Sequence, residues 1–194
     1  MSISNPIQKK IILASSSPRR QELLKNMDLN FEINCREVEE IYPEGLKGKD
    51  IAEYLAKLKA SAFNHSEIPE EHILITADTV VCVGDQLLAK PNDFKHAREM
   101  LELLSDKWHE VITGVCLKSN QKEKIFSAST QVRFKALSFS EIKYYIEKYK
   151  PYDKAGAYGI QEWIGFIGIK EISGSFYNVM GLPVQKLYEE LLTF

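Results

Sequence analysis

Short apolar runs alternate along this chain with stretches in which apolar residues recur three and four positions apart. The first run ends at Ala14, and the helical spacing starts after Pro18. An apolar run bounded by turn residues is typical of a strand, whereas recurrence at three and four positions is typical of an amphipathic helix. The expected strands are Ile11–Ala14, Phe31–Ile33, Ile73–Val83, Leu87–Leu88, Val111–Lys118, Ile125–Leu137 and Gly165–Ile172. The expected helices are Pro18–Met27, Asp50–Phe63, Phe94–Leu104, Glu141–Tyr149 and one that begins at Pro183.

Turn and capping residues support this order of elements. Gly84 and Asp85 separate two apolar runs and predict a hairpin, and Asp93 is a suitable N-cap for the helix that follows it. Ser138 and Glu141 have the spacing of a capping box. No linker-like segment interrupts the order, so we expect residues 1–194 to form one domain. The expected fold class is α/β, with a mixed sheet, flanking helices and two lobes around a central cleft.

The composition narrows the class of protein. The chain has 194 residues, 44% of them hydrophobic, which is enough to bury a sizeable core. With 25 basic and 27 acidic residues its formal net charge is −2, so we expect no general nucleic-acid binding and only a local phosphate site. The three cysteines are widely spaced, which argues against a disulfide framework or a structural zinc site. The N-terminal MSISNPIQKK does not resemble a signal peptide, and no run approaches the ~20 apolar residues of a membrane span, so we expect a cytoplasmic protein without membrane contact.

The segment between the first strand and the first helix has the composition of an anion site. Ser17 is a suitable N-cap and Pro18 suits the first helical position, but Arg19 and Arg20 occupy the first turn. They add positive charge to a helix end that already carries about half a positive charge from the backbone dipole. A phosphate would relieve this repulsion, and removing Arg20 should then change the stability of the free protein little or raise it. The alternative is a capped helix whose arginines bend into solvent.

Other polar residues stand where a core would not favour them. Asp78 and Thr79 interrupt an apolar run, and a buried carboxylate without a partner is costly, so Asp78 is the leading catalytic candidate. The alternative is an Asp at a strand end that backbone amides satisfy. Lys90 could reach a phosphate as a point charge or be an ordinary turn lysine. Glu39 and Glu40 offer oxygen ligands that Mg²⁺ accepts, although acidic loop residues are commonly just solvated.

A second unusual segment, Tyr152–Gln161, reads YDKAGAYGIQ. Its small residues allow a close approach of the backbone, and the Gln161 amide could pair with the edge of a nucleobase. The alternative is a tight connection that carries a surface glutamine. Lys57 and Lys59 lie near the apolar face of their expected helix, where long side chains usually reach to the surface.

Taken together, these segments resemble the Maf-like nucleoside triphosphate pyrophosphatases. The resemblance covers nearly the whole chain, through LASSSPRRQELL, VEE, AKLKA, ITADTVV, AKPND, HEVITGV, YDKAGAYGIQ and GSFYNVMGLPV. It implies a mixed α/β protein with a central cleft, commonly a homodimer, that hydrolyses a nucleoside triphosphate to the monophosphate and pyrophosphate with a divalent cation, Mg²⁺ or Mn²⁺. The AGAYGIQ form, with Thr after Asp78, is similar to the branch that acts on dTTP and UTP.

The resemblance also implies roles for individual residues. Asp78 matches the proton acceptor and, with Glu40, is expected to ligate the metal. The residues expected around phosphate and metal are Ser15, Arg20, Glu40, Lys59 and Lys90, of which Lys59 and Lys90 join Asp78 in the catalytic set. The residues expected to select the base are Arg19, Thr79 and Gln161.

Several alternatives stay open at this point. Asp78 could take the proton of the attacking water or hold the cation whose bound water attacks. Attack at the α-phosphate releases pyrophosphate, whereas attack at the γ-phosphate leaves a diphosphate, and only the resemblance favours the former. The same site could accept modified or non-standard nucleotides, or the chain could be a non-catalytic nucleotide sensor in cell division.

Overall fold

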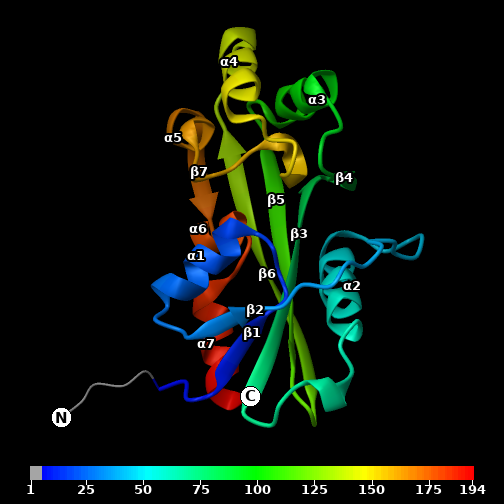
Figure 1. Cartoon of the computed structure of the whole chain (residues 1–194). Coiled ribbons are helices and arrows are strands. Elements are labelled where there is room, and N and C mark those ends of the chain that lie inside the picture. Colours follow the sequence, from blue (N-terminus) through cyan, green and yellow to red (C-terminus); the bar gives the residue numbers. More distant parts are fainter. Residues whose placement is uncertain (1–5) are drawn as a thin grey trace, which may run out of the picture.

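The computed structural model describes residues 6–194, and its centre is a seven-stranded sheet with helices on both faces (Figure 1). Residues 1–5, part of the N-terminal stretch in which we expect no signal peptide, lie outside the described range. The strands are β1 (Lys10–Leu13), β2 (Phe31–Ile33), β3 (His72–Val83), β4 (Gln86–Leu88), β5 (Trp108–Lys118), β6 (Glu123–Phe134) and β7 (Ile169–Ser173). The α-helices are α1 (Pro18–Asn26), α2 (Gly48–Ser61), α3 (Phe94–Leu104), α4 (Phe139–Tyr149), α5 (Trp163–Gly168), α6 (Phe176–Met180) and α7 (Val184–Thr193), and the 3₁₀ turns are η1 (His65–Glu67) and η2 (Ala155–Ala157).

The sheet is mixed, as expected, with the strand order β2-β1-β3-β5-β6-β7. Strand β1 runs parallel to β2 and β3, whereas β3, β5, β6 and β7 pair antiparallel. On one edge of β3, β1 pairs with residues 72–75 and β4 pairs with residues 81–83. Residues 76–80 therefore have no strand partner on that edge within the described chain. This gap in the sheet is where a cleft can form.

The two faces of β3 bury different layers, because successive side chains of a strand point to opposite faces. Leu74 and Val80 pack in clusters with α2, whereas Ile73, Ile75 and Ala77 belong to the larger core with α1, α3, α4 and α7. Figure 1 shows α2 on one side of the long strands, α1 and α7 on the other, and α3, α4 and α5 grouped at one end. The long strands thus run between α2 and the α1–α7 side and continue to the helices at one end.

Helix α2 packs very closely on the sheet. Its buried face carries Ala52, Ala56 and Ala60, each with 0% exposure. A side chain on Gly114 of β5 would place its Cβ 2.3 Å from the Ala52 carbonyl oxygen, so only glycine fits there. The Thr76 hydroxyl donates a hydrogen bond of 2.6 Å to the Ala56 carbonyl oxygen. Small residues and this bond set the height of α2 above β3, and hence the position of Lys59 in its last turn.

The expected strand Gly165–Ile172 is wrong in its first half. Residues Trp163–Gly168 form α5, and only Ile169–Ser173 pair with β6. A Cβ on Gly165 would lie 1.8 Å from the Ile160 carbonyl oxygen, so the chain turns tightly at this glycine. The apolar residues of this stretch fit a strand period, but they serve two different elements.

Helix α6 was not expected, because it has five residues and is too short for a periodic apolar pattern. It is capped by Ser175, whose hydroxyl accepts from the Asn178 amide, and by Gly181 in the left-handed conformation. The other elements are confirmed with bounds shifted by a few residues. Among residues 6–194, no helix is both long and apolar enough to cross a bilayer.

Candidate active site

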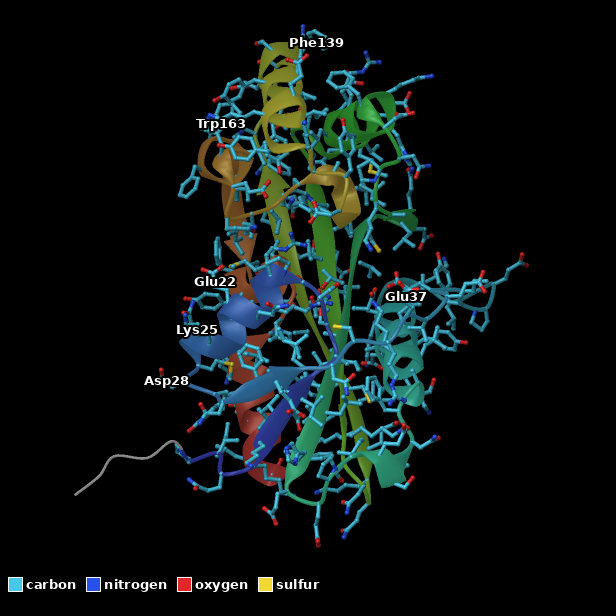
Figure 2. The ribbon with its side chains drawn as sticks, in the orientation of Figure 1. Glu22, Lys25, Asp28, Glu37, Phe139 and Trp163 are labelled. Carbon is cyan, nitrogen blue, oxygen red and sulfur yellow. The ribbon has the colours of Figure 1, made fainter. Side chains whose placement is uncertain are left out.

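A cleft of about 780 Å³ opens at the unpaired edge of β3. Its walls come from residues 14–20 before and within α1, residues 35–40 of the loop that follows β2, residues 153–161 around η2, and residues 179–181 at the end of α6. Figure 2 shows Glu37 on the loop between β2 and α2, and Glu22 and Lys25 on α1 at the other side of the long strands. Segments far apart in the sequence therefore converge on one cavity.

The structure brings all the expected site residues to this cleft. Asp78 and Thr79 are adjacent on β3 and point to opposite faces of the sheet, yet both line the cleft because the edge of the strand is open there. The lining includes Ser15, Arg19, Arg20, Glu40, Lys59, Asp78, Thr79, Lys90 and Gln161.

Lys59 joins the two carboxylates that were expected to hold the metal. Its Nζ lies 2.5 Å from Asp78 Oδ1 and 2.8 Å from Glu40 Oε1. The side chains of Lys59 and Asp78 are only 17% and 13% exposed, so their charges are mostly shielded from water. Burial acts to raise the pKa of Glu40, but the hydrogen bond from Lys59 and the charges of Lys59, Lys90 and Arg20 lower it overall. Lys59 is thus a charge partner in the site and does not reach to the surface.

Glu40 and Asp78 could supply oxygen ligands to a divalent cation such as Mg²⁺. Such cations bind through one or two carboxylates together with waters and substrate phosphates, without an all-protein cage. Glu40 and Asp78 contact the same ammonium group of Lys59, so the two carboxylates lie close together. Within residues 6–194 no group of three or more His, Cys, Asp or Glu residues could hold a metal unaided. The two carboxylates therefore fit a cation that shares its coordination with a phosphate.

Arg20 is held by protein groups, which the sequence did not indicate. Its Nε donates to the Gly181 carbonyl oxygen at 2.8 Å, its Nη1 to Ser15 Oγ at 3.4 Å and its Nη2 to Thr79 Oγ1 at 3.1 Å. Burial lowers the pKa of Arg20, Asp78 acts in the opposite direction, and the guanidinium remains charged at neutral pH. Arg20 therefore connects α1 with β3 and with the end of α6 at the edge of the cleft.

At the start of α1 the structure corrects the expected Ser17 cap and disagrees with the alternative in which Arg19 bends into solvent. Ser17 occupies the N-cap position, but its side chain makes no capping hydrogen bond. Instead the Ser17 amide donates to Ser15 Oγ at 3.3 Å. Arg19 does not bend freely into solvent, because its Nη1 lies 3.1 Å from Asp153 Oδ2. The positive helix start is thus balanced in part by a carboxylate from the 153–161 wall.

The 153–161 wall is supported by a partly buried network of charged residues that sequence reasoning missed. Lys154 Nζ lies 2.7 Å from Asp153 Oδ1 and 3.1 Å from Glu162 Oε1, and it is only 9% exposed. The Tyr145 hydroxyl donates to Glu162 and accepts from the Gly159 amide. Charged residues beside a glycine-rich stretch were the one available signal in the sequence. These contacts fix the backbone that carries Gln161.

The small residues of this wall approach protein backbone. The Gly156 amide donates to the Ala89 carbonyl oxygen at 3.2 Å, beside the exposed Lys90. Gly156 and Ala157 both have positive φ, which suits glycine and strains alanine. Gln161 is partly buried, and its Oε1 has no hydrogen-bond partner among the described residues. An unpaired amide oxygen at the wall of a cleft fits a ligand that donates a hydrogen bond.

Comparison with known proteins assigns the family. The family model of the Maf-like proteins matches residues 10–194. The chain belongs to this family. A Flavobacterium psychrophilum protein named dTTP/UTP pyrophosphatase is 54% identical over 94% of this chain and 93% of its own length. Proteins of the same name are 49% identical in Parabacteroides distasonis, over 99% of this chain and 100% of theirs, and 50% identical in Bacteroides thetaiotaomicron, over 97% and 98%.

Among solved structures, the Staphylococcus aureus Ham1 protein matches 65% of this chain and 72% of its own with a TM-score of 0.43 and 15% identity. A likeness at this level carries no argument about the Maf-like chain. The fold described above therefore stands on its own topology and on the family match.

Low pH is expected to destabilise this Maf-like protein through His109. The ring is 2% exposed, stacks on Phe134 and shares a hydrogen bond of 2.7 Å with the Tyr158 hydroxyl. Burial lowers the pKa of His109 to about 4. The unfolded chain, with a pKa of about 6.5, takes up a proton that the folded state refuses, so stability is lost as the pH falls from about 6.5 towards 4.

His109→Gln should remove this contribution, which amounts to about 2 kcal/mol between pH 7 and pH 5. Denaturant unfolding at both pH values gives the free energy of unfolding of each protein. The loss of this free energy between pH 7 and pH 5 should be smaller in His109→Gln than in the wild type. Tyr158→Phe is the control. It should keep the wild-type pH dependence of the free energy of unfolding, because burial is what lowers the pKa of His109. An equal loss of unfolding free energy between pH 7 and pH 5 in the wild type and His109→Gln would contradict the prediction.

Proposed function

We propose that this chain is a nucleoside triphosphate pyrophosphatase that hydrolyses dTTP and UTP to the nucleoside monophosphate and pyrophosphate. The observation that carries the proposal is the convergence of Asp78, Glu40 and Lys59 with Arg20 in one cleft at the open edge of β3. The names of the full-length relatives at about half identity support the same activity. We further propose that the chain forms one Maf-like domain, in line with the family match over residues 10–194.

The reaction follows from the charges around the cleft. A triphosphate brings about four negative charges, which Arg19, Arg20, Lys59 and Lys90 offset. A water oxygen attacks the α-phosphorus, the bond to the β-phosphate oxygen breaks, and pyrophosphate leaves with that electron pair. The proton of the water passes to Asp78, which its ion pair with Lys59 holds in place at the cleft. The alternative role for Asp78 is that of a metal ligand.

Glu40 and Asp78 would hold a divalent cation, which would supply charge neutralisation at the triphosphate. This proposal rests on the proximity of the two carboxylates, which share Lys59 as a partner at the cleft. We further propose that the protein acts in the cytoplasm as a homodimer, without a nucleic-acid partner. These proposals rest on the family resemblance and on the absence of a net basic charge.

Turnover of a panel of nucleoside triphosphates with Mg²⁺ or Mn²⁺ is expected to favour dTTP and UTP and to release pyrophosphate. The reason is that Arg19, Thr79 and Gln161 all line the cleft. The assay scores pyrophosphate and orthophosphate separately, with a chelator as the control for the cation. Orthophosphate as the first product, or preferred turnover of 7-methyl-GTP, contradicts the proposal. A preference for modified nucleotides supports the alternative substrate class, and binding without turnover supports a sensor.

A further inference from the structure

Three side chains form a line of hydrogen bonds from the cleft into the core. Arg20 Nη2 lies 3.1 Å from Thr79 Oγ1, which lies 2.9 Å from Thr113 Oγ1. Thr113 is 0% exposed, and its hydroxyl oxygen is 3.0 Å from the backbone carbonyl oxygen of Asn178 in α6. Thr113 does not line the cleft, whereas Thr79 does.

The direction of these bonds follows from the number of protons. A carbonyl oxygen only accepts, so the single proton of the Thr113 hydroxyl goes to Asn178. Thr113 then accepts the proton of Thr79, and Thr79 accepts from the guanidinium of Arg20, which only donates. This arrangement makes all three bonds, whereas reversing the bond between the threonines leaves Thr113 with nothing to give Asn178. Every donor in the line therefore points away from the cleft.

The consequence concerns what Thr79 can offer a ligand. A hydroxyl has one proton and two lone pairs, and Thr79 uses the proton on Thr113 and one lone pair on Arg20. Only the second lone pair remains for the cleft. Phosphate oxygens at neutral pH are acceptors, so Thr79 cannot bond to them in this state. It can bond to a donor on the nucleoside, such as an imide N–H of the base or a hydroxyl of the sugar.

We propose that Thr113 is a positioning residue for substrate selection, which holds the Thr79 hydroxyl as an acceptor for a hydrogen-bond donor of the nucleoside. The inference rests on the proposed nucleotide-hydrolysing function and adds a residue outside the cleft to it. It also accounts for the buried polar side chain of Thr113 in β5, where Ile112 and Val115 are buried and apolar. A valine would fill the same volume without fixing the hydroxyl.

The test is a thermodynamic double-mutant cycle in which one change is Thr113→Val and the other is removal of a hydrogen-bond donor from the ligand. Affinities of the non-hydrolysable α,β-imido forms of UTP, N3-methyl-UTP and 3′-deoxy-UTP are measured by calorimetry for wild type and Thr113→Val. In the wild type, one of the two donor-deleted ligands should bind about three- to tenfold more weakly than the UTP form. The weaker one identifies the donor as base or sugar. In Thr113→Val that penalty should shrink to within about twofold, because the released hydroxyl turns its proton to the cleft.

Two variants separate positioning from general damage. Thr113→Ser keeps the hydroxyl and should restore the wild-type penalty. Thr130→Val is the matched control, because Thr130 is also buried and bonds Asn178 and Ser175, but makes no contact with Thr79. It should leave the penalty unchanged. In turnover, Thr113→Val should raise KM for UTP about three- to tenfold with little change in kcat, since the bond is present before and during the reaction.

Equal affinity of the wild type for all three ligands overturns the proposal. This comparison uses only the wild-type protein, so it does not depend on whether a variant folds. A penalty that persists in Thr113→Val, or that disappears equally in Thr130→Val, overturns it as well. Failure of the proposed function has a different readout, since a wild type that releases no pyrophosphate from UTP or dTTP can still show the binding cycle. Failure of the imido form of UTP to bind the wild type overturns the proposal directly.

Discussion

Asp78→Asn is expected to lower turnover by about a hundred- to ten-thousandfold, the range that general acid–base catalysis contributes. Asparagine has the same shape and can still accept from Lys59, which keeps its second partner Glu40. However, an amide neither takes a proton from water nor ligates Mg²⁺ well. The fold should persist, and a melting curve together with the rate of pyrophosphate release from dTTP measures both effects.

The matched control is Glu22→Gln, which neutralises an exposed carboxylate of α1 outside the cleft lining (Figure 2). It should retain most of the activity. Near-normal turnover in a folded Asp78→Asn protein would exclude Asp78 from the mechanism. The residual rate also separates its two roles: a lost metal ligand raises the cation concentration needed for half-maximal rate, whereas a lost base removes the acid limb of the pH profile.

Arg20→Ala is expected to lower kcat/KM by about ten- to over a hundredfold, because it removes a charge-assisted contact with phosphate. The stability of the free protein should fall by about 1–3 kcal/mol, since the Gly181 carbonyl oxygen, Ser15 and Thr79 all lose a donor. This reverses the expectation from sequence, in which removal of a cation from a helix start relieves repulsion. Thermal unfolding with and without a non-hydrolysable triphosphate separates the two effects.

Lys25→Ala is the control on the same helix, since Lys25 is exposed and lies outside the cleft lining (Figure 2). It should change neither triphosphate affinity nor turnover. Arg20→Lys should recover part of the affinity but little of the stability, because an ammonium cannot reproduce the fork of the guanidinium. An unchanged affinity in Arg20→Ala would make Arg20 purely structural and would contradict the anion-site interpretation of the helix start.

The sequence predicted most elements because local chemistry determines them. The capping box of Ser138 and Glu141 is present, and Asp93 caps α3 through the His96 amide. The long apolar runs became β3, β5 and β6. Where one run served two elements, as in Gly165–Ile172, periodicity failed, because the turn at Gly165 depends on the backbone of Ile160.

The sequence also predicted the residues of the candidate site. Asp78, Thr79 and the arginines of α1 were singled out because charged and polar groups at such positions are unfavourable unless something binds them. Glu40, Lys90 and Gln161 were also candidates from their own chemistry, and the resemblance added Ser15 and a site role for Lys59. All of them line one cleft.

Only the tertiary structure decided how these residues pair. Lys59 lies between Glu40 and Asp78 because the close packing of α2 over Gly114 sets its height above β3. The partners of the arginines come from distant segments, Asp153 for Arg19 and Gly181 for Arg20. Local propensity carries no information about contacts between positions more than a hundred residues apart. They depend on the gap that β1 and β4 leave along β3, and this gap is a property of the assembled sheet.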